Sequence, residues 1–141
     1  RVFGLWEGLD MPGFGAYGSP GAMAWTDLRS PDPDRAREFY GSLLSWTFTP
    51  VEMAGPAYTT ASTPGSGEPV AGLGDFMGMA GIPPHWDVYF RCDDTDGAVS
   101  RLTDLGGHAV APSFDTPYGR MACVTDPEGA VFWLLSTPPG R

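Results

Sequence analysis

The sequence predicts an α+β domain built from two βαβββ repeats, with the helices outside a curved, mostly antiparallel sheet. The first observation is an internal repeat: Asp32-Pro33-Asp34-Arg35-Ala36 recurs as Asp94-Thr95-Asp96-Gly97-Ala98, an offset of 94 − 32 = 62 residues. The second is that each copy shows the same order of one strand, one capped helix and three further strands. Two related halves predict one compact unit of approximate two-fold symmetry, and such units bind ligands where the halves meet.

The first repeat begins with alternating residues at 24–29, which predict a strand. Asp32 is placed as a helix N-cap, and Pro33 suits the first helical position. Apolar residues then recur on one face of an amphipathic helix of about three turns. They are Ala36, Phe39, Tyr40, Leu43 and Leu44. Three more strands are expected at 46–51, 57–62 and 70–76, between turns rich in Gly and Pro.

The second repeat follows the same order. A strand at 86–92 leads to Asp94, which caps a helix with Ala98, Leu102 and Leu105 as its buried positions. Gly106-Gly107 ends this helix. Strands at 108–111, 119–125 and 130–135 complete a domain at 22–137, with halves of about 22–78 and 84–137.

Residues 1–8 read like the strand at 130–135, because both carry Val-Phe followed one residue later by Leu. We therefore expect residues 1–8 to be the last strand of a preceding module, and residues 9–21, rich in Gly and Pro, to be a linker. Such an apolar strand needs a sheet edge to cover it. A homodimer, or pairing with the missing preceding module, is the expected assembly.

The composition limits the range of partners. Eight basic against 17 acidic residues give a formal charge of −9, which argues against nucleic acid and anionic membranes. No apolar run approaches the roughly 20 residues of a membrane span, and no leader segment is recognisable. Cys92 and Cys123 are expected as buried free thiols, with a disulfide or a reactive thiol as the alternative. These features fit a cytoplasmic protein with a small-molecule ligand.

Strand alternation sorts the residues of the first strand of each half into two faces. Ala24, Thr26 and Leu28 should pack under the helix, as should Val88, Phe90 and Cys92. The opposite face is polar and aromatic, with Trp25, Asp27 and Arg29 in the first half and Asp87, Tyr89 and Arg91 in the second. This face is interpreted as a ligand-holding concavity, with a solvated face or an oligomer interface as the alternatives.

Several spaced motifs resemble the vicinal oxygen chelate superfamily, which includes glyoxalase I, bleomycin resistance proteins and extradiol dioxygenases. In the first half they are Trp25-Thr-Asp-Leu-Arg29, Asp32 and Phe39-Tyr40-Gly-Ser-Leu-Leu-Ser-Trp46. In the second half they are residues 84–94, Leu105-Gly-Gly107, Thr116-Pro-Tyr-Gly119 and Asp126-Pro-Glu-Gly-Ala-Val-Phe-Trp133. The match covers roughly residues 22–137. It implies the glyoxalase/bleomycin-resistance fold and the second unit of a tandem-type member.

Enzymes of this superfamily usually hold a divalent metal with His, Glu or Gln from the first and last strand of each half. The resemblance places those positions at Trp25, Ala71, Asp87 and Trp133. Indole carries only an N–H donor and alanine has no ligating atom, so Asp87 would be alone, whereas such sites need three or four ligands. No metal cofactor is therefore expected. Metal ligation by His85 or His108 is not expected either, and His85 is assigned to the strand face opposite Asp87.

The favoured function is a metal-free binder of the bleomycin-resistance type, acting in resistance by sequestration or in secondary metabolism. A planar hydrophobic or aromatic compound would lie in the cup between the repeats. The expected ligand-binding residues are Trp25, Asp27, Tyr58, Asp87, Tyr89, Arg120 and Trp133. The indoles could stack on the ligand or only fill space, and Asp27 and Asp87 could form an ion-pair lattice with Arg29 and Arg91 or act as acid and base. Two alternatives remain: a lyase, isomerase or oxygenase using acid/base residues or a partner module's metal, and a non-catalytic structural half of a tandem protein.

Overall fold

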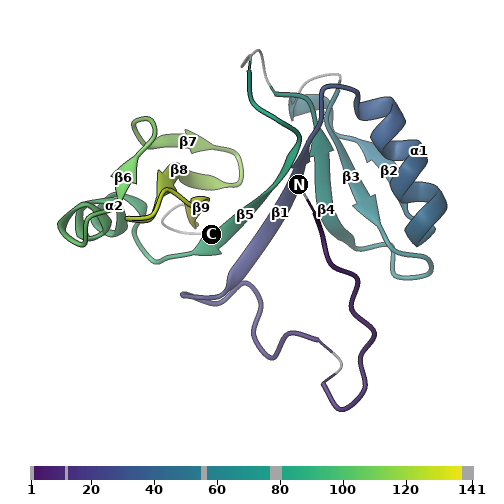
Figure 1. Cartoon of the computed structure of the whole chain (residues 1–141), viewed down its shortest axis with the longest axis horizontal. Coiled ribbons are helices and arrows are strands. Elements are labelled where there is room, and N and C mark those ends of the chain that lie inside the picture. The colour runs from purple at the N-terminus through teal and green to yellow at the C-terminus, as the bar shows by residue number, and fades with distance from the viewer. Residues whose placement is uncertain (1, 12, 55–56, 77–80, 138–141) are drawn as a thin grey trace. The chain divides into compact units, whose positions relative to one another are not determined.

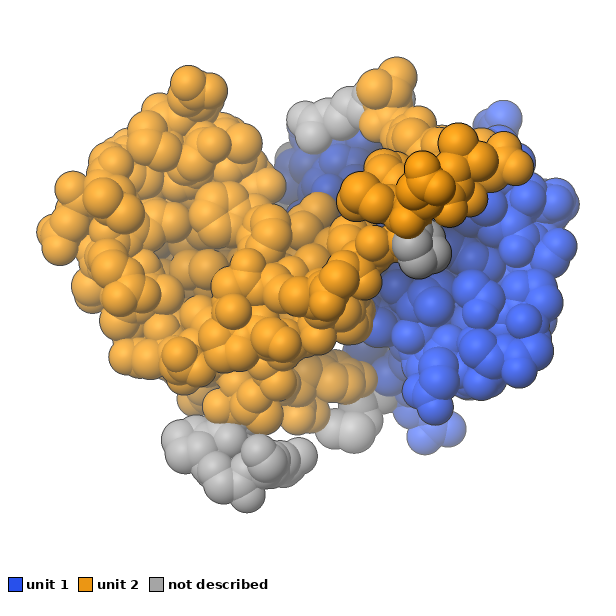
Figure 2. All heavy atoms as spheres, turned by 90° about the horizontal axis from the view of Figure 1, so that it is seen from below, with its two compact units in different colours: residues 1, 25–87 blue, residues 2–24, 88–141 orange. Residues whose placement is uncertain are grey.

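The computed structural model describes residues 2–11, 13–54, 57–76 and 81–137. The chain divides into two compact units, coloured separately in Figure 2. Unit 1 covers residues 25–87, and unit 2 covers residues 2–24 together with the chain from residue 88 onward. Each unit carries one α-helix and its own group of paired strands (Figure 1). The predicted α+β class is confirmed.

Unit 1 contains the first βαβββ repeat. Its elements are β1 (Met23–Arg29, from Trp25 onward), α1 (Pro33–Leu44), β2 (Thr47–Pro50), the 3-10 helix η1 (Glu52–Ala54), β3 (Thr59–Ser62), β4 (Pro69–Gly74) and the start of β5 (His85–Arg91). The strands pair in the order β2-β3-β4-β1. β1 runs parallel to β4, with Leu28 opposite Leu73, and the other two pairs are antiparallel.

Helix α1 begins as the sequence predicts. The Asp32 side chain accepts a hydrogen bond from the Arg35 backbone N–H at 3.0 Å, and Pro33 occupies the first turn. Tyr40 faces the strands and packs with Leu28 and Leu73. Around this core lie Ala36, Leu44, Trp46, Phe48 and Trp86. The core therefore lies between α1 and one face of the strands.

Two expected core residues of α1 are instead exposed. Phe39 retains 51% of its surface and Leu43 44%. Ala36, Tyr40 and Leu44 are spaced four residues apart and face the core, whereas Phe39 and Leu43 lie one position earlier, about 100° around the helix. The apolar face predicted from the sequence is therefore wider than the face that is buried.

Unit 2 contains the second repeat. After β5 come α2 (Thr95–Asp104), β6 (His108–Ala109), β7 (Phe114–Thr116), β8 (Gly119–Thr125) and β9 (Val131–Ser136). The strands pair in the order β5-β9-β8-β6, and β7 also pairs with β8. As in unit 1, the first and last strands run parallel, with Tyr89 opposite Trp133. Antiparallel pairs outnumber parallel pairs in both units, as expected.

The second repeat departs from prediction at two places. Residues 108–111 were expected as one strand, but β6 ends at Ala109 and the separate strand β7 follows Pro112, which cannot donate a backbone hydrogen bond. Leu105 was expected in the core, yet it is 74% exposed. It stands at the C-cap of α2, where the chain turns away at Gly106, whose φ is +90°. The remaining strands predicted for the two repeats are confirmed, with ends that differ from the prediction by at most two residues.

The segment before β1 forms no strand among residues 2–11 and 13–22. Val2, Leu5 and Trp6 are exposed. At its end, the backbone N–H of Gly21 donates to Arg91 O and the N–H of Arg91 donates to Ala22 O. The pairing of residues 1–8 with a preceding module stays a prediction, as do the proposed linker and domain boundaries. In the described part of the chain, no helix combines the length and apolarity needed to cross a membrane.

Candidate functional site: a buried charge cluster and an aromatic stack

Four predicted site residues come together in unit 1, on the strand face opposite α1. Leu28 packs against Tyr40 of α1, so its neighbours Asp27 and Arg29 point to the other face of β1. Trp25 shares that face and lies beside Asp27. Tyr58, just before β3, and Asp87 on β5 complete the group. The strand alternation predicted for β1 is confirmed.

Asp27 accepts hydrogen bonds from three side chains. Its Oδ1 accepts from Trp25 Nε1 and from the Tyr58 hydroxyl, both at 2.8 Å, and its Oδ2 accepts from Arg29 Nη2 at 2.9 Å. The carboxylate is buried. A buried charge is tolerated when donors satisfy it in this way. The arrangement also fixes the position of the half-buried Trp25 ring.

Arg29 links the two acidic residues of the cluster. Its Nε lies 3.1 Å from Asp87 Oδ2, while its Nη2 bonds Asp27. All three side chains are almost completely buried, at 8% exposure for Arg29 and 6% for each aspartate. The expected ion-pair lattice is confirmed for Arg29. It is not extended by Arg91, which forms no ion pair with the described acidic residues.

His85 is the site residue that sequence reasoning missed. It was assigned to the face opposite Asp87, which is wrong, because residues two apart on a strand share a face. His85 Nε2 lies 3.2 Å from Asp87 Oδ1, and His85 Nδ1 lies 2.8 Å from the Pro83 carbonyl oxygen. Each ring nitrogen faces an acceptor, whereas a neutral imidazole donates at one nitrogen only. The ring thus connects Asp87 to the Pro83 carbonyl at the edge of the cluster.

Tyr58 enters the cluster as a neutral phenol. Burial raises its pKa above the ordinary value of 10.0, and the neighbouring negative charge and hydrogen bond of Asp27 raise the pKa further. Both effects disfavour a phenolate. The hydroxyl therefore serves as a donor to Asp27.

Ala71, where the resemblance placed a metal-ligand position, lies on the face of β4 that packs toward the helix. In β4, Ala71 shares the helix-side face of Leu73, while Gly72 stands opposite Asp27. The offset of 62 holds from Leu28 to Phe90, but their register partners are Leu73 and Leu134, an offset of 134 − 73 = 61. The first and last strands of the second half are therefore separated by one residue fewer than those of the first half. The structural counterpart of Trp133 is therefore Gly72, and a Cβ there would overlap the Asp27 carboxylate and the Tyr58 hydroxyl.

Two other predicted site residues meet in unit 2. Tyr89 on β5 and Trp133 on β9 stand opposite each other, with their rings stacked at 5.4 Å between centroids and 19° between planes. Phe114 of β7 meets the Trp133 ring edge-to-face at 6.2 Å. Trp133 is 9% exposed, and its Nε1 is buried without a hydrogen-bond partner among the described residues.

Arg120 is not brought together with these rings. It stands opposite Ser136 in the β8–β9 register, on the face that packs on Thr95 of α2. Its guanidinium bonds Asp96 at 2.8 Å and Asp115 at 3.0 Å. These exposed bonds raise the pKa of Arg120 and lower the pKa of Asp96. A role of Arg120 in ligand binding stays a prediction.

The residues present do not suit the metal of the family's enzymes. Trp25 and Trp133 offer only N–H groups, Gly72 offers no side chain, and Asp87 already bonds Arg29 and lies within bonding distance of His85. Within the described ranges, no three His, Cys, Asp or Glu side chains are grouped to hold a metal ion. That these positions hold no metal stays a prediction, which the donor chemistry motivates.

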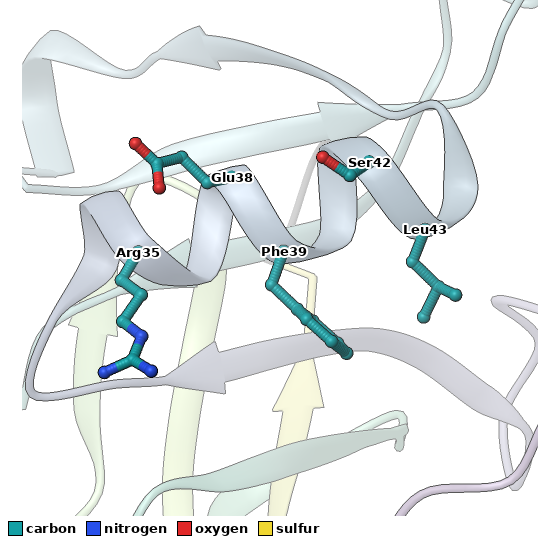
Figure 3. A pocket seen from close by; sticks show the side chains of 5 residues that line it. All are labelled: Arg35, Glu38, Phe39, Ser42 and Leu43. Atoms are coloured by element: carbon teal, nitrogen blue, oxygen red, sulfur yellow. The ribbon is translucent and has the colours of Figure 1, made fainter.

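A hollow elsewhere on unit 1 involves none of the predicted site residues. It lies on α1 and is lined by Arg35, Glu38, Phe39, Ser42 and Leu43 (Figure 3). Phe39 and Leu43 point the same way from the helix. These are the apolar side chains left exposed by the narrow core contact of α1.

Comparison with known proteins gives a family match over most of the chain. The family model for the glyoxalase-like domain matches residues 25–135. The anthracycline biosynthesis protein DnrV of Streptomyces peucetius is 37% identical over 142 residues, which span 99% of this chain and 50% of DnrV. CFP32 of Mycobacterium tuberculosis, provisionally named a glyoxylase, is 33% identical over 139 residues, 96% of this chain and 52% of CFP32. The chain thus spans about half the length of these relatives.

Solved structures show the same fold. The Mn(II)-bound glyoxalase of Novosphingobium aromaticivorans matches with a TM-score of 0.58 at 15% identity. The match covers 83% of this chain and 39% of that protein. At this level of identity the likeness concerns the fold alone, which agrees with the βαβββ order found in each unit.

Proposed function

Because the chain belongs to the family of glyoxalase-like domains, we propose that it binds a planar hydrophobic or aromatic small molecule without a metal. DnrV and DauV are named for anthracycline biosynthesis, and anthracyclines are flat, fused-ring aromatic compounds. The chain covers about half of each of those proteins, so the proposal concerns ligand binding by this half. The expected placement in secondary metabolism or in resistance by sequestration belongs to the same proposal.

The observation that carries the proposal is the fixed indole of Trp25. Its N–H donates to Asp27 at 2.8 Å, and Arg29 and Tyr58 hold Asp27 in turn. The ring is therefore positioned before any ligand arrives, which lowers the entropic cost of binding. A half-buried, immobilised aromatic face suits stacking on a planar compound, a contact that adds about 0.5–1.5 kcal/mol beyond area burial.

Unit 2 supplies a second aromatic group with the same kind of chemistry. Tyr89, Trp133 and Phe114 form a stack with one edge-on ring. Phe114 is partly exposed and so offers apolar surface at the side of Trp133. Trp25 and Trp133 stand at positions where the resemblance to the superfamily places metal ligands. Aromatic rings at these positions support ligand binding in place of metal chemistry.

Tryptophan fluorescence tests the binding proposal. Anthraquinone-2-sulfonate, a soluble planar probe, should quench the intrinsic fluorescence of the chain in a saturable manner. Trp25→Ala and Trp133→Phe should each weaken binding, by up to about tenfold if a full stacking contact is lost. Trp6→Phe is the matched control, since Trp6 is exposed in the segment before β1. Absence of saturable quenching by this and other planar probes would contradict the proposal.

Elemental analysis of purified protein tests the metal-free part. We expect substoichiometric Fe, Zn and Mn after purification without chelator. A stoichiometric metal would overturn this part and favour the lyase, isomerase or oxygenase alternative. If neither a metal nor a planar probe binds, the chain is better explained as a structural half of a tandem protein.

A further inference from the structure

Trp133 carries a buried donor for which the described residues of unit 2 supply no acceptor. Its side chain is more than nine-tenths buried, and its Nε1 is shielded from solvent with no acceptor among the described residues. Buried polar groups are nearly always paired in folded proteins, because an unpaired one loses its hydrogen bonds to water without replacement. This donor is therefore open to an acceptor that the described residues do not supply.

The surroundings of Trp133 restrict what that partner can be. One ring contact is the stack on Tyr89, and Phe114 meets the indole edge-to-face. With Tyr89 stacked on it, the indole offers its N–H edge as a specific contact, and this donor points in the plane of the ring. The neighbouring rings are apolar and aromatic, so they suit a flat molecule better than a charged or strongly hydrated one.

We propose that Trp133 Nε1–H is a specificity-determining donor for a carbonyl oxygen on the edge of a planar aromatic ligand, as in a quinone. This inference rests on the proposed function, since it names the ligand chemistry that the binding site of a planar compound would select. A ligand of the same shape without the oxygen would leave the N–H unpaired and should therefore bind less tightly by the contribution of one hydrogen bond.

Two matched probes isolate the hydrogen bond from stacking. Anthraquinone-2-sulfonate and anthracene-2-sulfonate share three fused rings and one sulfonate but differ in the two ring carbonyls. The wild-type protein should bind the quinone about three- to tenfold more tightly, the range expected for one neutral hydrogen bond. Trp133→Phe removes the N–H and should reduce this preference to about one. Trp6→Phe should leave the preference unchanged.

A second replacement protects the test against misfolding of the Phe variant. Incorporation of 3-benzothienylalanine at position 133 keeps the bicyclic shape and replaces the N–H by sulfur, so it should abolish the preference with the fold intact. In ¹⁵N–¹H spectra of the wild-type protein, the Trp133 indole signal should move downfield with the quinone and not with the anthracene.

The outcomes separate this inference from the proposed function. Equal binding of both probes to the wild-type protein would overturn the role of Trp133 while leaving planar-compound binding intact. A preference for the quinone that survives loss of the N–H would also overturn the role of Trp133. The same holds if the indole N–H already bonds an ordered water and its signal does not move when the quinone is added. Failure of both probes to bind would instead count against the proposed function.

Discussion

Trp25 of unit 1 and Trp133 of unit 2 place the same side chain in contrasting surroundings. The N–H of Trp25 donates to a buried carboxylate that an arginine and a tyrosine also hold. The N–H of Trp133 is just as strong a donor, but it faces no acceptor in the described chain. Among the described residues, the buried side-chain donors and acceptors of unit 1 are paired, whereas unit 2 retains one donor without an acceptor. The difference separates a group that fixes structure from one that is available for recognition.

The largest effect should come from removing the cation of the unit 1 cluster. Arg29→Met leaves Asp27 and Asp87 buried without their shared partner, and we expect the free energy of unfolding to fall by about 3–5 kcal/mol. Chemical denaturation followed by circular dichroism measures the loss. Arg120→Met is the control, because Asp96 and Asp115 remain in solvent after that change and the effect should be small. A loss of about 1 kcal/mol or less for Arg29→Met would mean that the cluster is not held by this arginine.

A smaller loss should follow from adding one methyl group at position 72. In Gly72→Ala the new Cβ would overlap Asp27 and Tyr58, so the cluster must shift, at a cost of about 1–3 kcal/mol. Gly41→Ala is the opposite case. Its Cβ would meet Phe48 and Trp46 at 3.5 Å, an ordinary contact, and alanine favours helix α1 by about 0.5–1 kcal/mol. Unfolding midpoints of the two variants should move in opposite directions. A neutral Gly72→Ala would show that the cluster is loosely packed.

Tyr58→Phe should cost about 1 kcal/mol at neutral pH, because Asp27 loses one buried donor. The raised pKa of Tyr58 predicts a pH dependence as well. Its contribution to stability is complete below the ordinary tyrosine pKa of 10.0 and is lost as the pH rises through the higher folded-state value. Absorbance titration of tyrosine ionisation should show a late step that Tyr58→Phe removes. Tyr118→Phe, at an exposed tyrosine, should retain that step. If both variants retain the late step, the step belongs to a tyrosine other than Tyr58.

The most delicate comparison is spectroscopic and concerns the two indoles directly. Charge-assisted bonds to a carboxylate are short and strong, so the Trp25 indole proton should resonate downfield of that of Trp133. Trp25→Phe and Trp133→Phe assign the two signals in ¹⁵N–¹H spectra. Coincident shifts in the ligand-free protein would erase the distinction between the two units.

The elements that the sequence predicted well are those governed by local chemistry. Asp32 and Asp94 cap the helices as expected, because a capping carboxylate acts on N–H groups two or three residues away. Leu28 and Asp27 were sorted correctly onto opposite faces of β1, because alternation is a property of the strand itself. For the same reason, His85 could have been placed beside Asp87 from its spacing alone.

Other features depend on contacts that no local pattern encodes. Helical spacing predicted an apolar stripe on α1, but whether Phe39 in that stripe is covered depends on the tertiary neighbours of the helix. The placement of Ala71 was wrong because the first and last strands are separated by one residue fewer in the second half than in the first. Alternation places Arg120 on the same face of β8 as Ala122 and Val124. Which face of β8 packs against α2 depends on tertiary contacts, so the sequence pattern alone did not predict it. The hydrogen-bond partners of the two indoles also depend on tertiary neighbours. Trp25 has an acceptor in Asp27, whereas Trp133 has none among the described residues.

The absence of a side chain at Gly72 has a consequence for any attempt to build a metal site in this chain. Tyr58 and Asp27 occupy the volume that a histidine or glutamate at this position would need. A single substitution that introduced a ligating residue there would collide with both, so it would disturb the cluster before it could hold a metal. Metal coordination at this position would require Tyr58 to shrink at the same time. An engineered metal site at position 72 therefore needs at least two coupled substitutions.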